Sequence, residues 1–233
     1  MSVAEKLTTI AENVPKVFEA GKEAEHTTFW ESYLKTAYMA YRFAGNGWND
    51  TTFAPTKNIK SGTASANGMF RESKIVNLKQ CLESCGVSMD VSKANNVSNL
   101  LGYCDVLEVV PKIDISSASD KTTYLFANDS KLRIIEELVV SETVTFASNS
   151  FNKCSALTHL IMTGTLATNG LDLSGSPNLD EESLASIVNV LQDRVSAGLS
   201  GTNTISLNAQ SESKISDADK AKISQKGWSV TYK

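Results

Sequence analysis

Apolar residues return at a fixed interval in the middle of the chain. Three segments begin with a large apolar residue, at Leu101, Phe126 and Phe151, so both intervals are 25 residues. Each segment has a Leu six residues after this anchor and another aliphatic residue nine residues after it. One unit of this kind cannot bury its apolar side alone, so the pattern predicts stacked copies that share a core.

The position three residues after each anchor carries a small side chain. Cys104 and Cys154 occupy it in the first and third segments, and Asp129 or Ser130 occupies it in the second. We expect a tight turn there. The residues between the aliphatic positions are mostly polar, and such alternation is typical of short strands.

An Asp between apolar residues recurs at Asp90, Asp114 and Asp172, each followed two residues later by Ser. In stacked copies these carboxylates could line up in a row, which could suggest calcium binding. The Gly-rich spacing of calcium-binding repeats is absent, so turn residues that are solvated or paired with Ser are the favoured interpretation.

The last part of the chain changes to alternating helix and strand signals. Apolar residues at helical spacing behind an acidic first turn predict a helix over 180–191. We expect a strand over 204–208, a second helix that starts at Ser216 and stops at Gly227, and a closing strand over 228–232. This tail would cover the apolar end of the stacked copies.

The first residues carry an apolar stripe with heptad spacing. The stripe lasts about two heptads, which is shorter than a secure coiled coil needs, and Pro15 interrupts it. One interpretation is a short amphipathic helix packed on its own domain, and the other is a device for homo-oligomerisation. The stripe consists of Val3, Leu7, Ile10, Val14 and Val17.

The unit over 150–160 resembles the BspA-like subclass of leucine-rich repeats, whose units combine an aromatic residue, a turn with Cys or Asn, and a Ser-x-Leu-x-x-Ile element. Here Phe151, Cys154, Leu157 and Leu160 carry the resemblance. It implies an α+β repeat fold, namely a leucine-rich-repeat solenoid with short strands, a helical N-terminal cap and an α/β C-terminal cap. It also implies a binding or scaffolding role without catalytic apparatus.

The end of the chain, with Lys226, Gly227 and Trp228, is similar to the closing segment of repeat proteins from gut bacteria and their phages. A length of 233 residues, 41% of them hydrophobic, suits one elongated domain. The expected divisions are an N-terminal amphipathic helix over 1–22, an N-terminal cap over 23–65, BspA-like repeats over 66–177, and a C-terminal helix-strand-helix-strand cap over 178–233.

Charge and hydropathy narrow the choice of partners and location. A net charge of −4 without a polybasic segment disfavours nucleic acid and anionic membranes as partners. The start of the chain lacks the apolar run of a signal peptide, and no stretch approaches the roughly 18 apolar residues of a membrane-spanning helix. We therefore expect cytoplasmic synthesis and no membrane insertion, with a virion or a cell surface as a possible destination.

The cysteines and histidines offer little catalytic chemistry. Cys81 and Cys85 are four residues apart on an expected helix, and the absence of a Cys-x-x-Cys pair leaves zinc binding unsupported. Buried free thiols are the expectation for the cysteines. Neither His26 nor His159 has the sequence context of a catalytic triad or dyad. We expect no metal, no cofactor and no enzymatic activity.

If the protein has a binding surface, it should lie on the strand face, where residues alternate with buried aliphatic side chains. Mixed charge and some apolar area favour a protein or a surface glycan as partner. The alternative is that these are ordinary exposed positions, because a fold does not entail a function. The candidate residues are Lys112, Asp114, Glu137, Val139, His159 and Ile161.

Two functional hypotheses follow. The first is a non-catalytic recognition or structural protein, such as a tail or fibre protein of a phage or an adhesion protein of a bacterial surface. The second is a cytoplasmic protein–protein interaction module. A hydrolase of cell-wall glycan is a distant third.

Overall fold

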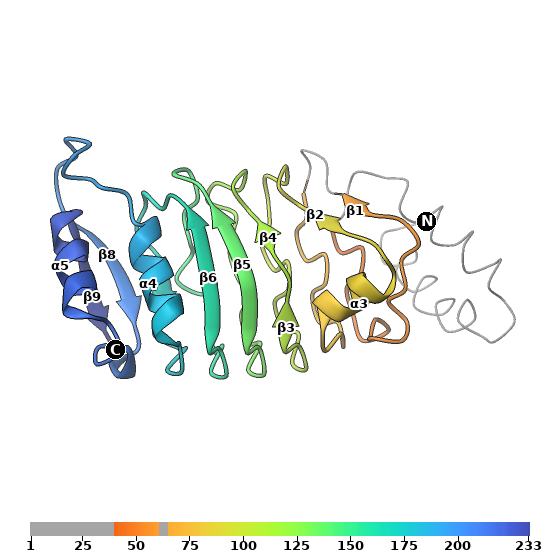
Figure 1. Ribbon diagram of the computed structural model, residues 1–233. Helices are drawn as coiled ribbons and strands as arrows, with labels where there is room; N and C mark the ends of the chain where they lie inside the picture. Colours follow the sequence, from red (N-terminus) through yellow and green to blue (C-terminus); the bar gives the residue numbers. More distant parts are fainter. Residues whose placement is uncertain (1–39, 61–64) are drawn as a thin grey trace, which may run out of the picture.

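The computed structural model describes residues 40–60 and 65–233. Figure 1 shows the helices and strands following one another in chain order along the long direction of the molecule. The elements are β1 (Ile59–Lys60), α3 (Leu78–Ser84), β2 (Met89–Asp90), β3 (Val109–Val110), β4 (Ile113–Asp114), β5 (Ile134–Val140), β6 (His159–Gly164), β7 (Asp172–Leu173), α4 (Glu181–Val190), β8 (Asn203–Leu207), the short 3-10 helix Ala209–Ser211, α5 (Asp217–Gln225) and β9 (Trp228–Tyr232).

Within the described residues, the strands form three small parallel sheets. β1 pairs with β2, and β3, β4 and β6 all pair with β5 to form a central sheet. β7, β8 and β9 form the third sheet, in that order. The expected leucine-rich-repeat solenoid is therefore wrong, because no single sheet runs through the described part of the chain.

A continuous sheet is interrupted at two places, between β3 and β4 and after β6. Pro111 lacks a backbone N–H and separates β3 from β4, so that the two short strands pair with different halves of β5. After β6 the neighbouring element on the same side is a helix, α4, rather than another strand (Figure 1). A continuous sheet would need a strand at both places.

The 25-residue interval appears as the register of the central sheet. Val109 is the partner of Ile134, and Ile134 is the partner of His159. The same offset recurs in the third sheet, where Thr204 is the partner of Ser229. The apolar spacing in the sequence therefore predicts which strand residues become neighbours.

The core follows from the apolar anchors. Leu101, Phe126 and Phe151 are each at most 1% exposed, and the rings of Phe126 and Phe151 lie 5.3 Å apart. The core continues toward the N-terminus through Phe43 and Phe70, whose rings stack at 5.1 Å. Burial of these large side chains is the main favourable term that holds the copies together.

The predicted elements of the C-terminal part are confirmed. α4 begins after Asp180, whose carboxylate accepts a hydrogen bond from the Ser183 backbone N–H, as expected for a helix cap. Ser216 caps α5 by accepting the Asp219 N–H at 3.1 Å. β8 and β9 lie at the positions predicted for strands, within one residue at each end.

Several predictions concern residues outside the described ranges. These include the helix over 1–22 with Val3, Leu7, Ile10, Val14 and Val17, and residues 23–39 and 61–64 of the expected N-terminal cap. Among the helices that the structure describes, none is long and apolar enough to span a bilayer.

Candidate binding surface

The outer face of the central sheet carries the predicted site residues. Along β5 and β6 the buried side chains, such as Ile135, Leu138 and Leu160, point into the core. Residues that alternate with them are at least partly exposed, as the two-residue side-chain period of a strand requires. We refer to the exposed side of β3, β4, β5 and β6 as the outer face.

A β-bulge interrupts the outer face at its centre. Ile135 pairs with Leu160 and Leu138 pairs with Met162, so β5 has one more residue than β6 between these pairs. The extra residue leaves both Glu136 and Glu137 partly exposed on β5. Bulges redirect side chains in this way and often occur next to functional sites.

Glu137 is held from both sides. Its Oε2 lies 2.9 Å from Nζ of Lys112, and its Oε1 accepts a 2.7 Å hydrogen bond from the Thr163 hydroxyl. The hydrogen bonds from Lys112 and then Thr163 lower the pKa of Glu137 below its ordinary value. The carboxylate is therefore ionised and fixed in direction near neutral pH.

Glu136 pairs with a different element. Lys79, on α3, contacts its Oε1 through Nζ and lies 3.8 Å from Glu83 on its own helix. The hydrogen bond to Glu136 raises the pKa of Lys79. The bulge thus directs one carboxylate toward α3 and the next toward Lys112.

Asp114 and Val139 are neighbours in the sheet. They are register partners, and Val139 is in turn the partner of Thr163 on β6. Oδ1 of Asp114 accepts the backbone N–H of Ser116 at 2.9 Å. Ile161 is partly exposed on β6 opposite the bulge.

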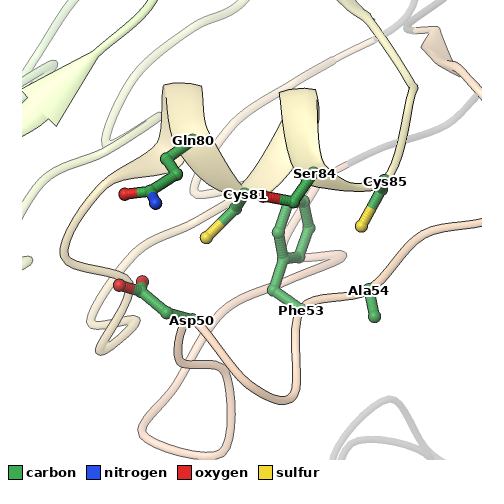
Figure 2. Close-up of a pocket in the computed structure, with 7 residues that line it drawn as sticks. All are labelled: Asp50, Phe53, Ala54, Gln80, Cys81, Ser84 and Cys85. Atoms are coloured by element: carbon green, nitrogen blue, oxygen red, sulfur yellow. The ribbon is translucent and has the colours of Figure 1, made fainter.

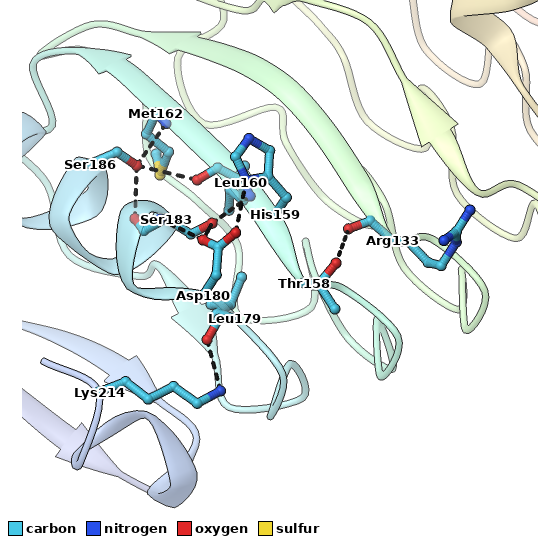
Figure 3. A network of polar contacts seen from close by, with 10 residues as sticks. All are labelled: Arg133, Thr158, His159, Leu160, Met162, Leu179, Asp180, Ser183, Ser186 and Lys214. Atoms are coloured by element: carbon cyan, nitrogen blue, oxygen red, sulfur yellow. Dashed lines mark hydrogen bonds and ion pairs between the residues drawn. The ribbon is translucent and has the colours of Figure 1, made fainter.

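His159 lies at the start of β6 and pairs outside the predicted set. Its Nδ1 is 2.9 Å from Oδ2 of Asp180, the residue that caps α4 (Figure 3). Burial raises the pKa of Asp180, but hydrogen bonds from Ser183 and His159 outweigh it, so the pKa lies below its ordinary value. The His159 side chain therefore contacts the N-terminal end of α4.

Helix α4 also closes the free edge of β6. The Ser183 hydroxyl accepts the Leu160 N–H at 2.8 Å, and the Ser186 hydroxyl accepts the Met162 N–H at 3.1 Å (Figure 3). The Ser186 hydroxyl is also 3.2 Å from the Leu160 carbonyl oxygen. The two serine hydroxyls thus form hydrogen bonds with backbone groups of β6 that could otherwise pair with another strand.

The recurring Asp residues serve as turn formers. Asp90 and Asp172 each accept the N–H of the Ser two positions ahead, as Asp114 does, and Asp172 also contacts Lys233 at 2.8 Å. Within residues 40–60 and 65–233, no group of three or more His, Cys, Asp or Glu side chains could hold a metal ion. The interpretation as Ser-paired turns thus matches the observed contacts.

The turn position after the anchors is occupied by Asp129 rather than Ser130. Asp129 is fully buried, and its Oδ1 accepts the Cys104 N–H at 2.7 Å, whereas Ser130 is exposed. Burial raises the pKa of Asp129 well above its ordinary value. Oδ2 has no hydrogen-bond partner within the described residues. Burial therefore favours the neutral, protonated form of this carboxyl group over the carboxylate.

A cavity of about 340 Å³ lies between α3 and the loop around Asp50 (Figure 2). Cys81 and Cys85 line it together with Phe53. Burial, followed by the charge of Asp50, raises the pKa of Cys81 to about 12, and burial also raises the pKa of Cys85. Protonated thiols are poor nucleophiles and poor metal ligands, so this cavity offers no reactive cysteine.

Sequence reasoning missed three polar residues: Glu136 and Thr163 on the outer face, and Lys79 on α3, which contacts this face through Glu136. The adjacent pair Glu136-Glu137 was an available signal, because two successive acidic residues break the alternation of a strand. Lys79 is 57 residues from Glu136 and gave no local signal.

Comparisons of this chain with family models, with curated proteins and with solved structures find no match. They therefore provide no support for the resemblance to BspA-like leucine-rich repeats.

Proposed function

We propose that this protein is a non-catalytic recognition protein that binds another protein through the outer face of the central sheet. The observation that carries the proposal is the Lys112–Glu137–Thr163 cluster, in which charged groups are fixed beside aliphatic side chains. Pre-oriented side chains lose little conformational entropy on binding, which favours affinity.

The composition of the face favours protein over glycan as its partner. Ile134, Val139 and Ile161 supply partly exposed aliphatic area between the charged pairs. The four strands of this sheet contain no Phe, Tyr or Trp, and such rings are the usual platform for a sugar. Complementary charges on a partner would set its orientation and its rate of association.

The state of the ionisable groups supports a non-catalytic role. A general acid or base works best with a pKa near the operating pH. The pKa of Glu137 is instead lowered, away from neutrality. Its lone pairs are also engaged by Lys112 and Thr163.

Photocrosslinking tests this proposal directly. A benzophenone side chain is placed at position 161, and the protein is irradiated in an extract of the cells that make it. The matched control carries the same group at position 195, because Val195 is an aliphatic residue that is 62% exposed outside the sheet. We expect one dominant adduct from position 161, and we expect Glu137→Arg to abolish it.

Two outcomes would contradict the proposal. One is an adduct pattern from position 161 that matches the pattern from position 195. The other is an adduct at position 161 that survives Glu137→Arg, which would show that the charged cluster takes no part in recognition.

A further inference from the structure

The turns of the central copies hold two tyrosines in an unfavourable backbone conformation. Tyr103 has φ 67° and Tyr124 has φ 57°, in the left-handed region that bulky residues rarely adopt. The same turns hold Asn99 at φ 53° and Asn128 at φ 66°, and Asn tolerates this region well. Each turn that contains a tyrosine in this conformation therefore also contains an asparagine in it.

The core does not require these rings. Leu101 and Phe126, which lie between the turn residues, fill the interior and are at most 1% exposed. Tyr103 and Tyr124 are both partly exposed. Lys153 has the same backbone conformation at φ 63°, so the conformation belongs to the turns, and the partly exposed rings are what set the two tyrosines apart.

The two rings form one platform. Their centroids are 5.9 Å apart, with an angle of 48° between the planes. The Arg71 guanidinium lies over the Tyr103 ring at 5.0 Å from its centroid, and its Nε is 3.0 Å from Oε1 of Glu72.

Two asparagines belong to the same group of turns. The Asn99 N–H donates to the Thr123 carbonyl oxygen, next to Tyr124, at 2.8 Å. The Tyr103 N–H donates to the Ala127 carbonyl oxygen, next to Asn128, at 2.7 Å. The backbone therefore places one asparagine beside each tyrosine in the adjacent copy.

We propose that Tyr103 and Tyr124, with Asn99, Asn128 and Arg71, form a carbohydrate-binding platform separate from the outer face of the sheet. The C–H bonds on one side of a pyranose ring carry slight positive charge and suit the negative face of an aromatic ring. A planar amide offers a donor and an acceptor, and a guanidinium offers paired donors, for adjacent hydroxyl groups.

The patch differs from the outer face in the features that select a sugar. Here two aromatic rings lie together and the backbone places an asparagine in the turn next to each, whereas the strands of the central sheet carry aliphatic and charged side chains. A net charge of −4 also disfavours a polyanionic ligand.

The test uses the whole protein labelled with carbon-13 in its tyrosine rings. Soluble gluco-, manno-, galacto- and N-acetylglucosamine oligosaccharides are titrated in, and the ring resonances are followed by NMR. We expect at least one oligosaccharide to shift the resonances of Tyr103 and Tyr124. Tyr103→Asn and Tyr124→Asn should each weaken its binding by about tenfold or more.

These substitutions suit the left-handed backbone, so the variants should remain folded. The matched control is Lys153→Asn, which makes the same replacement at φ 63° without removing a ring, and it should change binding by less than about twofold. The proposal is overturned if no oligosaccharide shifts the rings, or if the tyrosine variants bind as well as the control. It is also overturned if a proline-rich peptide shifts the rings and no oligosaccharide does.

Discussion

The central sheet and the C-terminal part of the chain satisfy their backbone groups in different ways. In the central sheet, β5 pairs with strands on both sides, and the charged side chains above it mostly pair with one another. Beyond β6, side chains form hydrogen bonds with backbone groups, as the hydroxyls of Ser183 and Ser186 do at the edge of that strand. Surface substitutions should therefore be tolerated in the first region and costly in the second.

Lys226 shows this dependence most clearly. Its Nζ donates to the carbonyl oxygens of Val188, Asn189 and Leu191 at 3.0, 2.8 and 2.6 Å. These carbonyls lie at the end of α4, where a helix leaves its acceptors without internal partners. Burial, followed by the charge of Lys222, lowers the pKa of Lys226, yet the ammonium also stabilises the negative end of the helix.

The largest effect is expected from Lys226→Met. Loss of three charge-assisted hydrogen bonds should lower the free energy of unfolding by about 2 to 3 kcal/mol. Urea unfolding followed by circular dichroism measures this change. Lys222→Met, four residues earlier on α5, is the control and should cost less than about 1 kcal/mol, because its contacts with Asp219 and Asn189 are exposed to solvent. Equal losses of stability from the two substitutions would contradict the special dependence of this region on Lys226.

Ser183→Ala should have a somewhat smaller effect. It leaves the buried Leu160 N–H without its acceptor and removes a donor to Asp180. We expect a loss of about 1 to 2 kcal/mol in the free energy of unfolding. Native-state hydrogen exchange should also show faster exchange of the Leu160 amide. Exchange unchanged from that of the unsubstituted protein would mean that the hydroxyl does not close this edge.

Asp129→Asn replaces a buried ionisable group in the core of the central region with one that does not ionise. The pKa of Asp129 is raised in the folded state, so the unfolded chain releases this proton at lower pH. The stability that depends on the proton is complete below the ordinary carboxyl pKa and is lost as pH rises through the folded pKa.

The asparagine keeps the acceptor for the Cys104 N–H and has no proton to lose. The variant should match the unsubstituted protein in acid and be more stable by about 1 kcal/mol near pH 8. Chemical unfolding at a series of pH values measures this difference. A difference that does not grow with pH would contradict a protonated, buried Asp129.

The sequence predicts strand neighbours better than it predicts sheets. The 25-residue spacing of the anchors equals the offset between the sheet partners Val109, Ile134 and His159, because the copies stack in register. Pro111 and the helix over 180–191 are visible in the sequence, but whether they interrupt the sheet depends on which segments pack beside them. A resemblance built on repeat spacing could not supply these features.

The candidate site was predicted in part for the same reason. Strand alternation correctly places Lys112 and Glu137 on one face, but the ion pair between Lys79 and Glu136 joins elements distant in sequence. The choice of Asp129 over Ser130 follows from the acceptor that the Cys104 N–H needs. That need is visible only when the adjacent segments are packed together.

The central claim is that the outer face of the sheet serves binding rather than stability. The double variant Lys112→Met, Glu137→Gln tests it in one measurement series, by urea unfolding and by titration against the partner identified by photocrosslinking. We predict a change of less than about 1 kcal/mol in the free energy of unfolding and at least about tenfold weaker binding. Undiminished binding, or a large loss of stability with binding retained in the folded fraction, would contradict the claim.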